Sequence, residues 1–189
     1  MKYIAREKTI MLVIVATLFI MLCGIPFMQL MPMITEDILH VGESGMGILM
    51  SVSGAGAIIG SVTLASVPSR KRGAIMIISG CVMGLALVGF AFSRWWALSL
   101  IMVIFVGLGQ TSNRTSGNAL VQSYTEPEYR GRVMSFMMME LGFSSLGTFF
   151  AGLLADIIGV QWAIGGLAIA LIIMSIIFAT ATKRLRQLE

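Results

Sequence analysis

The chain has 189 residues, of which 57% are hydrophobic and only 12% charged, and its mean hydropathy is +0.93. Soluble domains carry about 25% charged residues, so the composition excludes an ordinary soluble domain and predicts a membrane protein. The net charge of +4 does not indicate nucleic-acid binding, because Lys and Arg stand in short clusters between apolar runs, as they do in proteins that cross a bilayer.

Six apolar runs are long enough to cross a lipid bilayer, which takes about 20 residues of helix. In chain order we expect spans at approximately 9–31, 45–66, 73–92, 96–121, 133–155 and 158–181. Pro26 in the sequence Gly24-Ile25-Pro26 predicts a kink in the first span, because proline lacks a backbone donor and crowds the preceding turn. Residues 1–189 are therefore expected to form one all-α transmembrane domain of six helices.

Basic residues gather in every second connection between these spans. They are Lys2, Arg6, Lys8, Arg70, Lys71, Arg72, Arg130, Arg132, Lys183, Arg184 and Arg186. The positive-inside rule then predicts a multi-pass protein of the inner (plasma) membrane with both termini in the cytoplasm. The basic residues of this set that lie between spans are Arg70, Lys71, Arg72, Arg130 and Arg132. They either only determine the topology or also hold a cytoplasmic gate closed through networks of charged side chains.

Small residues are dense in the second and fifth spans. The segments MGILMSVSGAGAIIGS and VMSFMMMELGFSSLGTFFAG carry them at three- and four-residue spacing. Small residues allow helices to approach closely in lipid, and tight packing alone would explain each glycine. Because the two segments hold equivalent places and run in opposite directions, they also indicate a three-plus-three inverted repeat.

The most polar stretch follows the apolar part of the fourth span, in GQTSNRTSGNALVQSYTEPEYRGRVMS (109–135). No helix breaker occurs before Pro127, so the helix is expected to continue and to carry a polar face. We expect this face to line a cavity, or alternatively to be satisfied within the bundle. The candidate cavity-lining residues, with one from the first span, are Gln110, Asn113, Arg114, Gly117, Asn118 and Gln29.

Arg114 and Glu140 are the two charged residues predicted to lie at membrane depth. Ionisable residues in a bilayer are costly and usually face a cavity or a partner. We expect the two to face a central cavity and to interact directly or through water, with Glu140 as the candidate proton carrier. In the alternative interpretation Arg114 extends to the headgroups and Glu140 is a hydrated packing residue.

Enzymatic chemistry is not predicted. The sequence contains no nucleophile–base set, phosphate-binding loop or metal-ligand spacing, and the single histidine, His40, lies in an acidic stretch. Cys23 and Cys81 lie inside apolar runs, where cysteine acts as a small packing residue. No metal and no cofactor is expected.

The segment NALVQSYTEPEYRGRVMS, followed by a Gly-rich helix ending in AGLLAD and then by IGVQWA, resembles the carboxyl-terminal half of a major facilitator superfamily transporter. It is most similar to the efflux branch that includes the enterobactin exporter and macrolide efflux proteins. The resemblance covers essentially the whole chain. The residues that match the branch's loop motif are Asn118, Leu120, Gln122, Pro127, Arg130, Gly131, Arg132, Val133, Met134 and Ser135.

The resemblance also shows a departure. A full family member has twelve helices, and Met1 falls where its central linker would be; the segment VPSRKRG (67–73) keeps basic residues but lacks the usual acidic one. The resemblance implies efflux of a small amphipathic, drug- or siderophore-like molecule by alternating access. It further implies a second six-helix half, as a homodimer or a separate chain. The alternative is a non-transporting membrane module, either a truncated remnant or a regulator of a full-length transporter.

Overall fold

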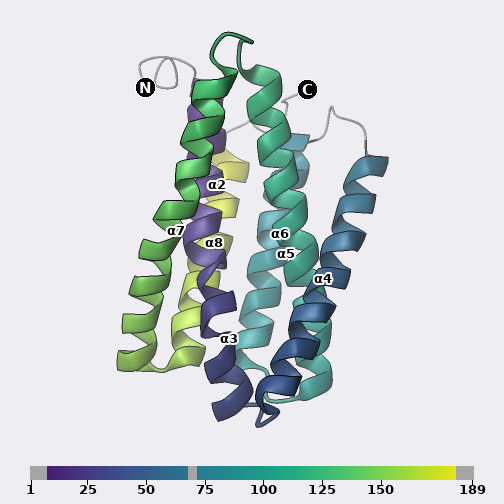
Figure 1. Ribbon diagram of the computed structural model, residues 1–189, viewed down its shortest axis with the longest axis vertical. Coiled ribbons are helices and arrows are strands. Elements are labelled where there is room, and N and C mark those ends of the chain that lie inside the picture. Colours follow the sequence, from purple (N-terminus) through teal and green to yellow (C-terminus); the bar gives the residue numbers. More distant parts are fainter. Residues whose placement is uncertain (1–7, 68–71, 182–189) are drawn as a thin grey trace.

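The computed structural model describes residues 8–67 and 72–181, and within these ranges the chain forms α-helices joined by short connections (Figure 1). The helices stand side by side as an up-and-down bundle, and the start of the first and the end of the last lie at the same end of it. Their bounds are α2 (Lys8–Gly24), α3 (Pro26–Asp37), α4 (Gly42–Ser66), α5 (Arg72–Phe92), α6 (Trp96–Tyr124), α7 (Arg130–Ile158) and α8 (Val160–Ala181).

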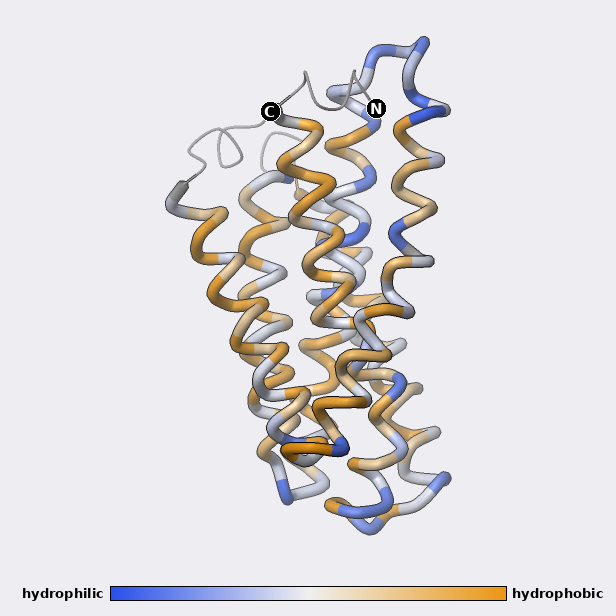
Figure 2. The backbone as a smooth tube through the Cα atoms, turned by 90° about the vertical axis from the view of Figure 1, so that its left-hand side faces the viewer, coloured by the Kyte–Doolittle hydropathy of each residue, from blue (hydrophilic) through white to orange (hydrophobic). Residues whose placement is uncertain are grey.

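Six helical runs among the described residues are long and apolar enough to cross a membrane, with α2 and α3 together forming the first. Figure 2 shows hydrophobic residues along the shafts of the helices and hydrophilic residues at both ends. Large apolar side chains are exposed on the shafts, as on Ile58 and Leu85. A surface of this kind is stable against lipid, so the expected all-α bundle of six transmembrane helices is confirmed.

The expected kink in the first span is confirmed at Ile25, between α2 and α3. The amide of Ile25 still donates to the Met21 carbonyl at 3.1 Å, and the Met28 amide donates to the Ile25 carbonyl at 3.0 Å. Pro26 has no N–H, so the interruption is a kink within one span and not a connection between two.

Several helices extend beyond the ranges expected from hydropathy. α3 continues to Asp37, α6 to Tyr124, and α7 runs from Arg130 to Ile158. Hydropathy marks the part of a helix that lies in the hydrocarbon, whereas the backbone ladder continues through polar residues that water can solvate. The polar connection between α6 and α7 consequently shortens to residues 125–129, where the hydroxyl of Thr125 donates to the Val121 carbonyl at 2.6 Å.

Helix α6 packs closely against α4 through glycines, of which two lie nearest to the facing backbone. Gly56 of α4 lies against the backbone of Ile104, and Gly107 of α6 lies against the backbone of Ser53. A Cβ atom at either position would collide with a backbone carbonyl, which cannot move aside as a flexible side chain can. The close α4–α6 approach therefore depends on the absence of a side chain at these two positions.

Some pairs of packed helices in one half of the chain have a counterpart in the other half. α4 packs on α6 as α7 packs on α2, and α5 packs on α6 as α8 packs on α2, while α5 and α8 pack on each other. The two members of each exchanged pair run in opposite directions along the bundle (Figure 1). This pattern is what a three-plus-three inverted arrangement produces.

Buried apolar residues form two clusters, one toward each end of the bundle. The first includes Phe27, Leu87 and Phe90, whose neighbours come from α3 to α8. The second, nearer the two chain ends, includes Val13 and Leu120 with partners from α2, α5, α6 and α7. Between the clusters lies a polar layer whose buried members include Thr17, Ser79, Asn113 and Glu140.

The α4–α6 contact predicts opposite effects for two glycines of the same helix. Gly56→Ala should lower the free energy of unfolding by about 1–3 kcal/mol, because the new methyl group collides with the backbone of Ile104. Gly54→Ala should raise it by about 0.5 kcal/mol, because nothing lies within 4 Å of a Cβ there and alanine has the higher helix propensity. Thermal unfolding of the purified protein in detergent measures both, and equal effects would contradict the packing description.

Candidate functional site

Polar side chains from three helices meet at one pocket in the middle of the bundle. α6 contributes most of them along one face, α2 contributes a hydroxyl and α7 a carboxyl group. The polar residues that line the pocket are Thr17, Gln110, Asn113, Arg114, Asn118 and Glu140. The expected cavity-facing positions on the fourth span and Glu140 thus lie together in the structure.

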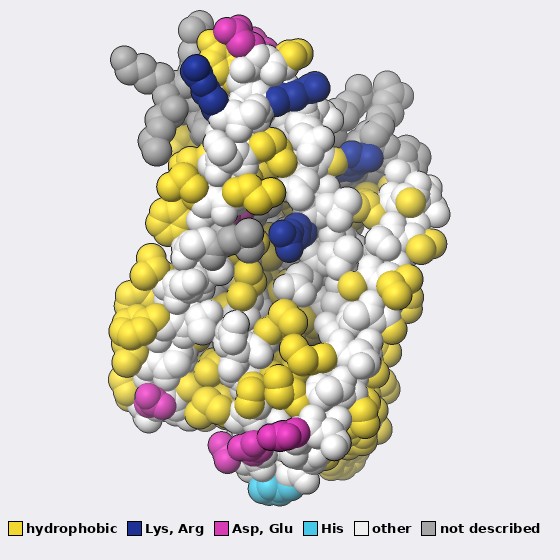
Figure 3. Space-filling view, in the orientation of Figure 1, with side chains coloured by type: hydrophobic (Ala, Val, Ile, Leu, Met, Phe, Trp, Pro, Cys, Tyr) yellow, Lys and Arg dark blue, Asp and Glu magenta, His cyan; other side chains and the backbone are white. Residues whose placement is uncertain are grey.

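The remaining wall of the pocket is apolar and rich in methionine. Its residues are Ile20, Met21, Ile25, Met83, Met137 and Met138. Together the two walls border about 700 Å³ of space, a figure that includes the open mouth. Figure 3 shows the hollowed face of the bundle, with a basic side chain at mid-height between the helices.

Glu140 is buried and held by a threonine of another helix. Its exposed fraction is 4%, and its Oε1 accepts a hydrogen bond from Thr17 Oγ1 at 3.0 Å. The same hydroxyl lies 3.1 Å from the Val13 carbonyl and 3.0 Å from the Ile14 carbonyl. A hydroxyl has one proton, so Thr17 donates either to its own helix or to Glu140.

Gly117 is buried but does not line this pocket, although we expected it to. A Cβ atom on Gly117 would collide with the Cγ2 methyl of Thr17. The glycine therefore allows α2 to approach α6 closely enough for Thr17 to reach Glu140. Its place in the site is behind the threonine and away from the open space.

Asn113 is satisfied within the bundle. Its side chain is 2% exposed, and Nδ2 donates to the Met76 carbonyl of α5 at 2.9 Å. Asn113 therefore matches the alternative interpretation of the polar face, in which its residues form hydrogen bonds within the bundle. Its neighbours on α6 differ, because Gln110, Arg114 and Asn118 have no hydrogen-bond partner within the described part of the chain.

Arg114 and Glu140 line the same pocket without forming an ion pair there. The guanidinium of Arg114 interacts electrostatically with the carboxyl group of Glu140. The atom that contacts this carboxyl group is the hydroxyl oxygen of Thr17, and the Arg114 side chain is exposed. Of the two expected forms of interaction, direct or through water, the direct contact is not seen; the described contact of this carboxyl group is with Thr17, and Arg114 acts on it electrostatically over a longer range.

Gln29 does not line this pocket. It lies on α3, beyond the kink at Ile25, and its side chain is exposed. The pocket-lining residues of the first span end at Ile25, one helical turn before Gln29.

The basic residues of the expected gate are only partly described. Arg72 begins α5, Arg132 is exposed in the first turn of α7, and Arg130 Nε donates to the Thr125 carbonyl at 3.3 Å. That bond stabilises the turn between α6 and α7. Arg70 and Lys71 lie outside the described residues. No group of metal-ligating side chains occurs among the residues that the structure describes.

Thr17 is the site residue that the sequence did not reveal. It is a single hydroxyl in the apolar run LVIVATLFIM, where a threonine usually bonds its own helix. The available signal in the sequence was a single polar residue within an apolar run at membrane depth. The partner could not be identified, because Glu140 is 123 residues away in the sequence.

An up-and-down bundle of six membrane-spanning runs around a mid-depth polar pocket defines a multi-pass membrane protein of the transporter class. The chain belongs to the Major Facilitator Superfamily, which residues 9–188 match. It is also similar to the Staphyloferrin A transporter of Staphylococcus aureus, with 25% identity over 176 residues. The match covers 92% of this chain and 44% of the relative, so the chain spans less than half of the relative's length.

These comparisons confirm the family that the loop motif of residues 118–135 suggested.

The Thr17–Glu140 contact predicts a measurable coupling between α2 and α7. Thr17→Val keeps the shape of the side chain and removes the donor, so it should lower the free energy of unfolding by about 1–3 kcal/mol. Thr17→Ser retains the hydroxyl and should lose less. In a double-mutant cycle with Glu140→Leu, unfolding measurements should give a coupling of more than about 0.5 kcal/mol. Strict additivity would contradict the contact.

Proposed function

We propose that the chain forms one half of an efflux transporter that moves a small amphipathic molecule across the inner (plasma) membrane by alternating access. The observation that carries the proposal is the pocket in the middle of the bundle, where Gln110, Arg114 and Asn118 have no partner among the described residues. Asn113 on the same helix is satisfied by the Met76 carbonyl, whereas these three side chains keep their donors available to a ligand.

The depth of the charged groups supports a cavity that is used. Arg114 lies ten residues before the end of α6 at Tyr124, and Glu140 lies ten residues after the start of α7 at Arg130. At a rise of about 1.5 Å per residue, each lies about 15 Å from the end of its helix. Ionisable groups at such depth are costly in a bilayer and usually mark an ion or substrate pathway.

The open face of the pocket supports a second six-helix half. α4 and α7 stand at opposite sides of this face (Figure 1), and they are the least buried of the six membrane-spanning helices. A two-fold axis along the membrane normal, in front of this face, would place α4 of one half against α7 of the other. The half is supplied by a second copy or by a separate chain, and the relative's greater length accords with a two-half assembly.

The homodimer form of this arrangement predicts crosslinking between α4 and α7 of different copies. In a background without Cys23 and Cys81, Met138→Cys combined with Ile58→Cys should give a crosslinked dimer in membranes. Both side chains are exposed, at similar distances from the ends of their helices, and Met138 lines the pocket. The readout is a shift to dimer mass on a denaturing gel.

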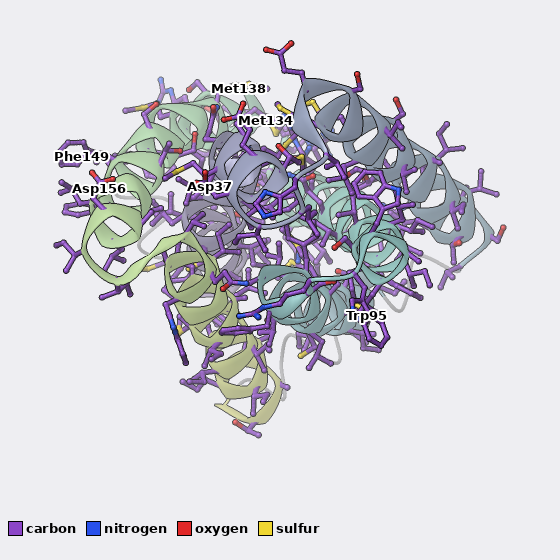
Figure 4. All side chains as sticks on the ribbon, turned by 90° about the horizontal axis from the view of Figure 1, so that it is seen from below. Asp37, Trp95, Met134, Met138, Phe149 and Asp156 are labelled. Carbon is purple, nitrogen blue, oxygen red and sulfur yellow. The ribbon has the colours of Figure 1, made fainter. Side chains whose placement is uncertain are left out.

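The matched control is Phe149→Cys with Ile48→Cys, again two exposed positions at similar depth. Figure 4, seen from below, shows Phe149 pointing away from the bundle, whereas Met134 and Met138 lie together on another side of α7. The control should remain monomeric. If both pairs give only monomer, the second copy is ruled out as the partner.

Glu140 is the residue that we propose as the proton carrier. Among the described residues it is the buried acid within a membrane-spanning helix, and Thr17 and Arg114 are the polar and charged groups that act on it. Glu140→Gln should abolish the response of transport to an imposed pH gradient and leave substrate exchange without a gradient largely intact. Flux from proteoliposomes holding the assembled transporter measures both activities.

Asp156→Asn is the control for this prediction, because Asp156 is an exposed acid at the other end of the same helix. It should keep the pH response of the unchanged protein. A full pH response in the Glu140→Gln variant would remove this residue from the coupling mechanism. Absence of flux from every assembled form would instead favour the non-transporting module.

A further inference from the structure

Arg114 places a positive charge in the middle of the bundle. It makes no hydrogen bond or ion pair within the described residues, and its exposed side chain lines the pocket. The other described arginines lie at helix ends or in connections and not in the middle of the bundle; they are Arg72, Arg94, Arg130 and Arg132. A guanidinium carries five donors in a planar fork that fits a carboxylate in a bidentate manner.

The acid in the pocket does not occupy this fork. Glu140 Oε1 accepts from Thr17 at 3.0 Å, on the side of the pocket formed by α2 and α7. Gln110 and Asn118 stand one turn before and one turn after Arg114 on α6, and their amide groups also lack partners among the described residues. One face of α6 therefore presents a cation between two unbonded amides.

The rest of the pocket suits an apolar group. Ile20 and Met21 of α2, with Ile25 at the kink, form one part of the wall, and Met137 and Met138 of α7 form another. Methionine side chains are flexible and polarisable, so they adapt to apolar groups of different shapes. The pocket thus has a cationic side on α6 and an adaptable apolar side on α2 and α7.

We infer that the pocket binds an amphipathic carboxylate, with Arg114 holding the carboxylate between Gln110 and Asn118 and the apolar body lying against α2 and α7. This inference rests on the proposed function and names the class of its substrate. Charge-assisted hydrogen bonds from arginine to a carboxylate are stronger than those between neutral groups, so the charge of the ligand decides its affinity.

In this arrangement Glu140 and Arg114 have opposite effects on the affinity for a carboxylate ligand. Its carboxyl group lines the same pocket and interacts electrostatically with Arg114. A bound carboxylate would be attracted by Arg114 and, when Glu140 is ionised, repelled by it. Replacing the two residues should therefore change the affinity for a carboxylate in opposite directions, which a merely structural role for either residue would not do.

The test measures the binding of three fluorescent probes that share one apolar body and differ in charge. Dansylglycine is the carboxylate, dansylglycinamide is neutral, and N-(2-aminoethyl)dansylamide is the cation. The full chain, with its complementing half where the two copurify, is placed in nanodiscs of phosphatidylcholine so that no anionic lipid competes. The unchanged protein should bind dansylglycine about tenfold more tightly than the neutral amide, and the cation most weakly.

Substitutions of Arg114 and Glu140 should change the affinity for the carboxylate probe, dansylglycine, and not the affinity for its neutral amide. Arg114→Gln should weaken dansylglycine binding about tenfold. The binding of the neutral amide should stay nearly unchanged, which shows that the pocket is intact. Arg114→Lys should retain part of the preference for the carboxylate probe. Glu140→Gln should tighten dansylglycine binding severalfold. Arg94→Gln, which replaces an exposed arginine between α5 and α6, is the matched control and should bind all three probes like the unchanged protein.

Equal binding of dansylglycine and its neutral amide by the unchanged protein would overturn the inference. Unaltered carboxylate preference in Arg114→Gln, or weakened dansylglycine binding in Glu140→Gln, would also overturn it. Flux separates this result from the proposed function. Proteoliposomes that move the neutral amide faster than the carboxylate would refute the substrate class and retain transport, whereas selective binding without any flux would retain the class and refute transport.

Discussion

The bond between Thr17 and Glu140 is the interaction on which the rest of the site depends. A carboxyl group at this depth needs a polar partner, and the two apolar clusters above and below leave only a thin layer for one. The bond joins α2 to α7, so the layer also fixes how these helices stand around α6. Asn113, bonded to the Met76 carbonyl, joins α6 to α5 in the same layer. The polar layer therefore serves two roles at once, since it holds the helices together and leaves part of the α6 face open.

Close backbone approach is what makes such a layer possible. Gly117 lets α2 lie against α6, and Gly56 and Gly107 let α4 lie against the same helix. In lipid no hydrophobic force draws helices together, so packing and short polar contacts must do so. α6 is thus held by glycine contacts on two sides. The neighbouring helices therefore fix the orientation in which the polar face of α6 lines the pocket.

The sequence predicted the spans well, because long apolar runs and basic connections follow directly from the cost of exposing polar groups to lipid. It also predicted that Gln110, Arg114, Asn118 and Glu140 share a pocket, since helical spacing and membrane depth were both readable. The pairing of Glu140 with Thr17 was not predictable, because it depends on how α2 packs beside α7. Gln29 was expected in the pocket, but the pocket wall ends one turn earlier in the first span, at Ile25, and the Gln29 side chain is exposed. Hydropathy also placed the helix ends too early, as at Tyr124, because water solvates the last polar turns.

The kink in the first span has a mechanical consequence. Pro26 has no N–H, so the Leu22 carbonyl has no donor four residues on, and this carbonyl lies against Gly147 of α7. Bending the span at this point breaks no main-chain hydrogen bond between these two residues. Ile25, at the bend, is part of the pocket wall. The first span can therefore change its angle where it borders the pocket at a lower energetic cost than an uninterrupted helix would incur, so the width of the pocket and the curvature of this span are linked.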